Sequence, residues 1–151
     1  MKIIILGAGQ VGSTAAFQLA RQEANEVTIV DHNATVLRDL QDRLDVRTVV
    51  GHAAYPATLE RAGAADADMI IALTSSDEVN MVACSVAHTL FHIGTKIARV
   101  RSAEYIATPN LFSPEAIPID MRISPEQLVT QPIQPLIHYP GSFQVLAVAD
   151  G

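Results

Sequence analysis

The segment that decides the fold is KIIILGAGQVG, residues 2–12. Its apolar run, residues 3–6, has the length and composition of a strand buried on both faces, as the strands of a parallel sheet are. The glycines that follow read G-x-G-x-x-G and stand at Gly7, Gly9 and Gly12. In a dinucleotide-binding unit the first makes the tight turn, the second lets the backbone approach a pyrophosphate, and the third lets the helix pack close to the strand. The segment therefore predicts a strand, a phosphate-binding turn and a helix whose N-terminus attracts an anion.

A second strand-like run supports this interpretation. Residues 26–31 end in a carboxylate, Asp31, nineteen positions beyond Gly12. An acid at about this distance hydrogen-bonds the adenosine ribose hydroxyls in a βαβ dinucleotide unit. It would repel the 2′-phosphate of NADP, and no arginine immediately follows it. A turn or helix-capping aspartate is the alternative interpretation of Asp31.

The composition is that of a globular protein. Of the 151 residues, 49% are hydrophobic and 17% charged, and the net charge of −6 leaves no basic surplus for a nucleic-acid surface. The single cysteine, Cys84, lies in an apolar helical pattern, which favours a buried thiol in a reducing compartment. No segment approaches the roughly eighteen apolar residues of a membrane-spanning helix, and the first apolar run is too short for a signal peptide. We expect a cytosolic domain that binds no nucleic acid.

Helical and strand-like patterns alternate along the first two thirds of the chain. Helices are predicted over residues 10–23, from the N-cap Asn33 to Leu44, from Pro56 to Gly63 and over residues 79–93, and further strands over residues 47–50, 68–73 and 97–101. This alternation is typical of an α/β fold, a Rossmann-type doubly wound parallel sheet with flanking helices and the strand order 3-2-1-4-5-6.

In that order the loop after the fourth strand faces the glycine loop across the ligand-binding crevice. Thr74 and Ser75 stand in this loop, and their hydroxyl and amide groups suit a pyrophosphate. Capping the following helix is the alternative role, and both roles are compatible. Asp77 and Glu78 would repel a phosphate at close range, so we expect them to cap the helix or to contact a partner.

The predicted fifth strand carries two arginines, Arg99 and Arg101, on one face near its carboxyl end. A strand covered by helices seldom holds two arginines unless an anion pairs with them. A phosphate is one such anion, and a carboxylate such as Asp77 or Glu78 is the other. We expect Arg99 rather than Arg101 to reach the nucleotide.

The pattern weakens after Tyr105, where a short sixth strand is predicted at residues 117–120. Ser124 has the features of a helix N-cap, and residues 143–148 form a strand-like run with no partner left to follow. We therefore predict three parts: a dinucleotide-binding domain over residues 1–123, a helix and linker over 124–141, and the start of a further, truncated subdomain over 142–151.

No constellation of catalytic or metal-binding residues stands out. His88 and His92 are four apart on a predicted helix, a spacing that can hold a metal, but no third ligand is evident. Surface or interface histidines are therefore favoured. No serine or cysteine stands in a nucleophile elbow, and Tyr105 lacks the lysine that a short-chain reductase places four residues on. The sequence assigns no catalytic residue and no metal site.

Four stretches also carry a family resemblance: residues 7–12, residues 68–84, the segment KIARVRS at 96–102, and the segment ISPEQLV at 123–129. Together they resemble the N-terminal domain of the KTN/RCK family, which includes the TrkA subunits, the cytosolic NAD-binding regulators of Trk potassium-uptake systems. The resemblance covers nearly the whole chain. It implies binding of NAD(H), or of ADP or ATP, without turnover, with domain rearrangement that gates potassium flux. The alternative is the cofactor-binding domain of an NAD-dependent dehydrogenase whose catalytic domain is missing.

The resemblance also implies roles by position. These are pyrophosphate contacts from Gly7, Ala8, Gly9, Gln10 and Val11 with Gly12 completing the motif, ribose contacts from Asp31, an adenine contact from His52, crevice contacts from Thr74 and Ser75, and a phosphate contact from Arg99. The Ser124 helix resembles the family's crossover helix, which packs on a second copy, so a dimer or higher oligomer is implied. Residues 142–151 would open a C-terminal RCK subdomain. The implied partner is a potassium-translocating membrane subunit, which would hold the protein at the inner face of the cell membrane.

Overall fold

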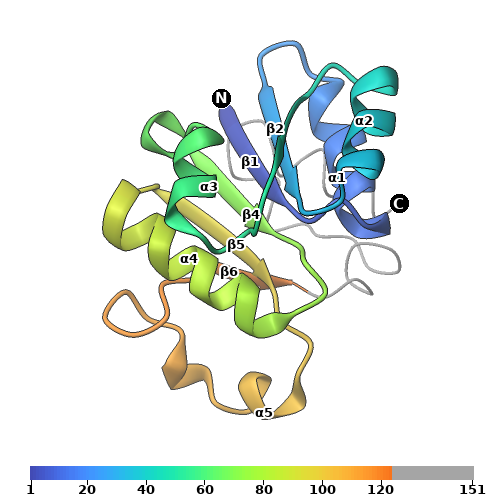
Figure 1. The fold of residues 1–151 in the computed structure, drawn as a ribbon. Coiled ribbons are helices and arrows are strands. Elements are labelled where there is room, and N and C mark those ends of the chain that lie inside the picture. Colours follow the sequence, from blue (N-terminus) through green and yellow to red (C-terminus); the bar gives the residue numbers. More distant parts are fainter. Residues whose placement is uncertain (124–151) are drawn as a thin grey trace.

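The computed structural model describes residues 1–123, which form one six-stranded sheet between helices (Figure 1). The strand order is β3-β2-β1-β4-β5-β6, and every neighbouring pair is parallel. The strands are β1 (Lys2–Leu6), β2 (Glu26–Asp31), β3 (Arg47–Val50), β4 (Met69–Ala72), β5 (Thr95–Arg99) and β6 (Met121–Ile123). The predicted fold class and strand order are confirmed.

The helices connect the strands as the alternating pattern predicts. They are α1 (Gln10–Ala20), α2 (Ala34–Arg43), α3 (Pro56–Arg61), α4 (Asp77–Phe91) and the short α5 (Ala103–Ile106), with 3-10 turns at Ala64–Asp66 and Pro109–Leu111. Asn33 caps α2 as predicted, because its side chain accepts the backbone N–H groups of Thr35 and Val36. Helix α1 ends three residues before the predicted Glu23.

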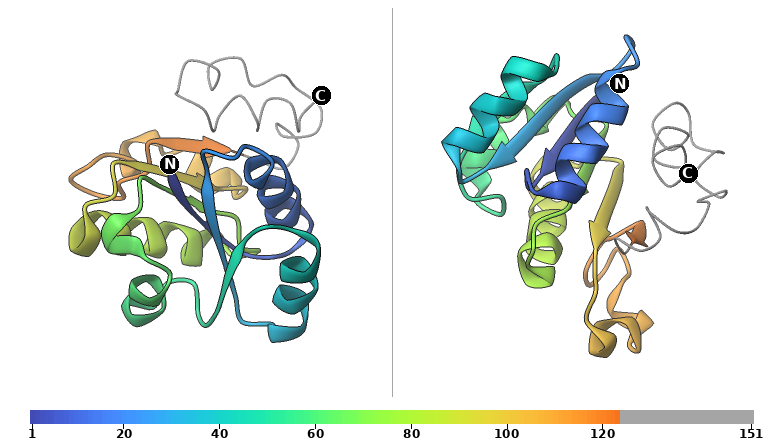
Figure 2. Two further views of the ribbon diagram at one scale, coloured as in Figure 1. Left: turned by 90° about the horizontal axis from the view of Figure 1, so that it is seen from above. Right: turned by 90° about the vertical axis from the view of Figure 1, so that its right-hand side faces the viewer.

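Two apolar cores cover the two faces of the sheet. Helices α1 and α2 cover one face and helices α3 and α4 the other, as Figures 1 and 2 show. On the first face Leu19 and Leu37 pack against the inward side chains of β1 and β2. On the second face Leu59 of α3 and Ala83 of α4 belong to the other core, together with Ile70 and Ala72 of β4. Because both faces are covered, β1 and β4 are buried along nearly their whole length, which is why they read as continuous apolar runs.

The last two strands differ from their predicted bounds. Strand β5 begins at Thr95 and ends at Arg99, and β6 follows the predicted 117–120 segment instead of occupying it. Asp120 explains the shift, because its carboxylate accepts the backbone N–H of Lys96 at 2.7 Å and lies 3.4 Å from the Lys96 ammonium. The ammonium also donates to the Ile93 carbonyl at 2.9 Å. With these partners Lys96 can be buried inside β5, although its charge made the sequence pattern place the start of this strand after it.

The 101–120 segment, which contains α5, extends away from the sheet (Figures 1 and 2). None of the helices within residues 1–123 has both the length and the apolar character needed to cross a membrane. The predicted crossover helix at 124–141 and the predicted subdomain start at 142–151 lie outside the described residues.

Cys84 is fully buried in the second core, as its apolar surroundings in the sequence predict. Burial raises the pKa of its thiol from 9.0 to about 12.

We expect the Cys84 thiol of the native protein to resist maleimide at pH 8, whereas the thiol of the urea-unfolded chain reacts at once. The free energy of unfolding should also fall as the pH rises above 9, because the unfolded thiol ionises there and the folded one does not. A Cys84→Ala variant should lack this component of the pH dependence, and a thiol that reacts equally in both states would contradict the burial.

Candidate functional site

A cavity of about 580 Å³ opens at the carboxyl ends of β1, β2, β4 and β5. All of the predicted binding residues except Ala8 and Gly12 line it: Gly7, Gly9, Gln10, Val11, Asp31, His52, Thr74, Ser75 and Arg99. Its volume lies within the range of about 300–1,000 Å³ that is usual for ligand pockets. The cavity also occupies the switch point of the sheet, where ligands of open α/β folds bind. The structure therefore brings the predicted set together in one place.

The glycine loop has the geometry that its spacing predicts. Gly7 has φ +102°, and a Cβ there would lie 2.8 Å from the Leu73 carbonyl oxygen. A Cβ on Gly12 would lie 1.8 Å from the Gly7 carbonyl oxygen, so α1 begins in direct contact with the end of β1. A Cβ on Gly9 would have no neighbour within 4 Å. The second glycine thus leaves space at the cavity wall that a bound group can use.

The N-terminus of α1 forms the wall beside that space. Gly9 is the N-cap and supplies no side-chain hydrogen bond, and the first turn holds no acidic residue. The first N–H groups of a helix have no partner within the helix, and here Gln10 and Val11 line the cavity. Uncapped N–H groups and the positive end of the helix dipole together favour a phosphate at this wall.

Asp31 lines the cavity and has the turn role that the sequence left open. Its Oδ2 accepts the Ala8 N–H at 2.7 Å, and its Oδ1 accepts the Asn33 N–H at 2.8 Å. The carboxylate therefore braces the glycine loop and the turn before α2. These bonds take two of its roughly four acceptor positions, and the His32 Nδ1 lies 3.4 Å from Oδ1. Asp31 therefore still has room to accept hydrogen bonds from ribose hydroxyls. Ala8 itself is buried in the core and does not line the cavity.

His52 contributes a flat surface at the edge of the cavity. Its ring stacks on Tyr55, with the centroids 4.2 Å apart and the planes 14° from parallel. The His52 Nδ1 accepts the Ala54 N–H at 3.1 Å, which fixes the ring relative to the loop. Tyr55 is 60% exposed and was not a predicted site residue, although its position three residues after His52 could have indicated a stacked pair.

The loop after β4 differs from the prediction in one detail. The cap of α4 is Ser76, whose Oγ accepts the Val79 N–H at 3.2 Å, and not Thr74 or Ser75. The Thr74 hydroxyl instead donates to Oδ1 of Asn80 at 2.6 Å. Thr74, Ser75 and Ser76 all line the cavity, so Ser76 both caps the helix and lines the cavity.

The two arginines occupy different positions. Arg99 ends β5, is 8% exposed and lines the cavity, where its Nη2 donates to the Thr74 carbonyl at 2.6 Å. Arg101 lies beyond β5, so the expectation that both share a strand face was wrong. Its Nη2 donates to the Ser75 carbonyl at 2.9 Å.

The acids beside the arginines bind the segment after β5. Asp77 accepts the backbone N–H groups of Arg101 and Ser102, the latter at 2.7 Å, and Glu78 accepts the Tyr105 hydroxyl at 2.9 Å. Within residues 1–123 no group of three or more His, Cys, Asp or Glu side chains could hold a metal ion. His92 ends α4 in the left-handed conformation, with its N–H donating to the His88 carbonyl.

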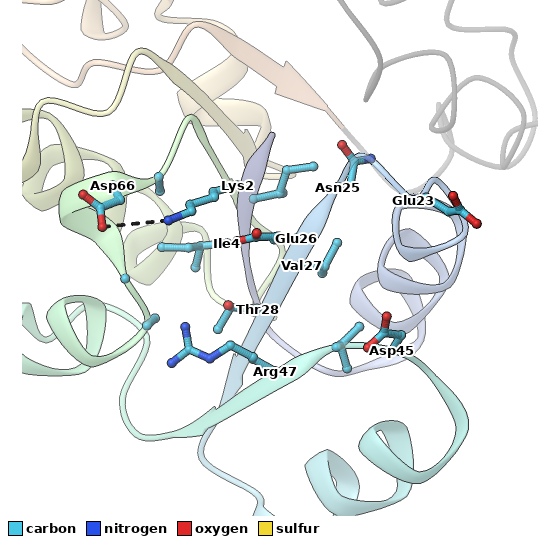
Figure 3. A pocket seen from close by; sticks show the side chains of 15 residues that line it. Lys2, Ile4, Glu23, Asn25, Glu26, Val27, Thr28, Asp45, Arg47 and Asp66 are labelled. Atoms are coloured by element: carbon cyan, nitrogen blue, oxygen red, sulfur yellow. Dashed lines mark ion pairs between the residues drawn. The ribbon is translucent and has the colours of Figure 1, made fainter.

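A second cavity, of about 370 Å³, lies at the opposite, amino edge of the sheet (Figure 3). Its charged lining residues are Lys2, Glu23, Glu26, Asp45, Arg47 and Asp66. Figure 3 shows Lys2 directed toward Asp66, with 3.9 Å between the charged atoms. Acids outnumber bases here and the glycine loop is at the other edge, so a phosphate is disfavoured in this cavity.

Comparisons with known proteins place this geometry in a family. The chain is 59% identical over 151 residues to the Trk system potassium uptake protein TrkA of Halomonas elongata, covering 100% of this chain and 33% of that protein. It is 56% identical to the TrkA of Vibrio alginolyticus, covering 99% of this chain and 33% of that one. The chain thus spans about a third of the length of these curated relatives.

Solved structures share the fold at low sequence identity. The TrkA-N domain of the inner membrane protein ybaL from Escherichia coli matches with a TM-score of 0.71 and 19% identity, over 83% of this chain and 88% of that one. The Kef CTD of Shewanella denitrificans, in AMP-bound form, matches with 0.69 and 20% identity, over 99% and 89%. The GsuK channel bound to NAD matches with 0.67 and 21% identity, over 83% and 21%.

The family model named TrkA-N domain matches residues 3–125. This range contains the glycine loop, Asp31, the Thr74 loop and Arg99, and relatives above 50% identity align over the full chain. The chain therefore belongs to the TrkA-N domain family.

Proposed function

We propose that this chain is the nucleotide-binding part of a regulatory subunit of a Trk-type potassium-uptake system, and that NAD(H) binds in the cavity at the carboxyl edge of the sheet. The observation that carries the proposal is the convergence of three features on one cavity. These are the open space at Gly9, the uncapped N-terminus of α1, and the Asp31 carboxylate with unused acceptor positions. The names of the full-length relatives support the transport role.

In this proposal each wall of the cavity receives one part of the nucleotide. The pyrophosphate lies against the α1 N-terminus at Gly9, Gln10 and Val11, and the adenosine ribose donates to Asp31. The adenine lies toward His52. The remaining half of a dinucleotide extends toward Thr74 and Arg99, because β4 and β5 lie on the other side of β1 from β2.

The choice of NAD(H) rests on the length of the cavity and the charge of Asp31. Residues from β2 to β5 line it, which suits a ligand with two nucleoside ends, whereas ADP or ATP would fill the Asp31 side alone. The carboxylate disfavours NADP because it would repel a 2′-phosphate. Among the structural neighbours, one is bound to AMP and another to NAD, which supports adenine nucleotides as the ligand class.

Binding without turnover distinguishes this regulator from a dehydrogenase domain. A bound nucleotide shifts a conformational equilibrium only by its differential affinity for the two arrangements. We propose that the arrangement concerns paired copies of this chain, attached at the inner face of the membrane through a potassium-translocating subunit. The full-length protein should not change NADH absorbance at 340 nm (an assay wavelength) with any added substrate, while NADH should raise its melting temperature. Substrate-dependent turnover at even ~1 s⁻¹ would favour the dehydrogenase.

Asp31→Ala tests the binding site directly. We expect the variant to bind NADH at least about tenfold more weakly, because hydrogen bonds to a charged group contribute about 1.5–3 kcal/mol each. Isothermal titration calorimetry on the 151-residue chain measures the affinity. Asp39→Ala is the matched control, since it removes the same charge from the exposed face of α2, where Asp39 pairs with Arg43, and it should bind as the unmodified protein does. If Asp31→Ala bound NADH with unchanged affinity, the ribose could not be bound by Asp31.

A further inference from the structure

Asn80 is a fully buried amide in helix α4, surrounded by an apolar core. Its Oδ1 accepts two hydrogen bonds from Thr74, from the backbone N–H at 2.9 Å and from the hydroxyl at 2.6 Å. Its Nδ2 donates to the Thr74 carbonyl at 3.2 Å and to the Arg99 carbonyl at 2.9 Å. All four of its hydrogen-bonding positions are therefore used, and all four bonds reach two residues of the cavity wall.

Arg99 completes this arrangement. Its guanidinium donates to the same Thr74 carbonyl at 2.6 Å, so Thr74, Asn80 and Arg99 are joined in one closed network between the ends of β4 and β5. Networks of this kind are rigid when every member is satisfied. Thr74 and Arg99 line the cavity, while Asn80 lies behind them and does not. Any effect of Asn80 on a ligand must therefore pass through these two residues.

We infer that Asn80 is a positioning residue that sets the second half of the nucleotide site and so the preference for a dinucleotide over a mononucleotide. The inference rests on the proposed function. The network lies at β4 and β5, whereas Asp31 lies at the end of β2 with β1 between them. A mononucleotide held by the α1 N-terminus and Asp31 does not need the network. A dinucleotide that extends to Thr74 and Arg99 does.

The test compares AMP and NADH binding by calorimetry in the 151-residue chain. In Asn80→Ala we expect NADH to bind at least about tenfold more weakly, because Thr74 and Arg99 lose their common anchor, while AMP affinity changes by less than about twofold. Ser85→Ala is the matched control: Ser85 is five residues further along α4, and its hydroxyl donates to the Met81 carbonyl of its own helix. This control should bind both ligands normally. A general loss of structure would weaken AMP as much as NADH, so an equal loss of both overturns the inference.

A second variant guards against misfolding. Asn80→Ser keeps a small polar group and should show the same split between NADH and AMP at a smaller magnitude, with circular dichroism reporting the fold of each protein. If Asn80→Ala does not fold, the serine variant decides, and an unchanged ratio of AMP to NADH affinity overturns the inference. A failure of the proposed function is distinguishable from a failure of this inference. If the proposed function is wrong, the unmodified protein itself binds neither nucleotide.

Discussion

Gly12→Ala is expected to unfold the domain or to leave it barely stable. The added Cβ would lie 1.8 Å from the Gly7 carbonyl oxygen and 2.8 Å from its carbon, both of which belong to the backbone. No rotamer change relieves such an overlap, so α1 would have to move away from the end of β1. Overlaps in a packed core cost about 1–3 kcal/mol when side chains can shift, and we expect about 4 kcal/mol or more here. That is a large part of the roughly 5–15 kcal/mol of a typical domain.

Urea denaturation followed by circular dichroism measures this loss. Gly94→Ala is the matched control, because a Cβ on Gly94 would have no neighbour within 4 Å, and its free energy of unfolding should change by about 1 kcal/mol or less. A Gly12→Ala protein with the midpoint of the unmodified chain would contradict the close contact of α1 with β1, and with it the position of the cavity wall at which we propose that a phosphate binds.

Local patterns in the sequence predicted the side of the cavity formed by β1, α1 and β2. The glycine spacing over residues 7–12 and the carboxylate at Asp31 lie within one βαβ unit, and each glycine has a steric role that its position alone specifies. The continuous apolar runs of β1 and β4 likewise follow from helices on both faces of the sheet. The strand order followed from the alternation of elements, and the structure confirms it.

The other side of the cavity was only partly predictable, because contacts distant in sequence build it. In the sequence Asn80 is one of several polar residues of α4, yet it bonds a residue nineteen positions away. Arg101 was assigned to a strand that ends two residues earlier, since the burial of Lys96 moves β5 toward the N-terminus. Such contacts leave no periodic signal, so Thr74 and Arg99 could be placed at the crevice but their common anchor could not.

Gly9→Ala is expected to weaken nucleotide binding roughly 100-fold in a domain that still folds. A Cβ on Gly9 has open space around it, and φ −72° is allowed for alanine, so the cost in stability should be about 1 kcal/mol, from the poorer N-cap. The methyl group would occupy the space through which a pyrophosphate approaches the N–H groups of Gln10 and Val11. Losing two charge-assisted hydrogen bonds at about 1.5 kcal/mol each corresponds to roughly a 100-fold loss of affinity.

Calorimetry with AMP and NADH separates this variant from the others. Gly9→Ala should bind both ligands more weakly, because in the proposed site both would place a phosphate at the α1 N-terminus, whereas Asn80→Ala should bind NADH alone more weakly. Gly94→Ala should bind both as the unmodified chain does. If Gly9→Ala retained NADH at full affinity, the nucleotide phosphates could not lie against this helix, and the cavity would have to bind its ligand through Asp31 and the Thr74 loop instead.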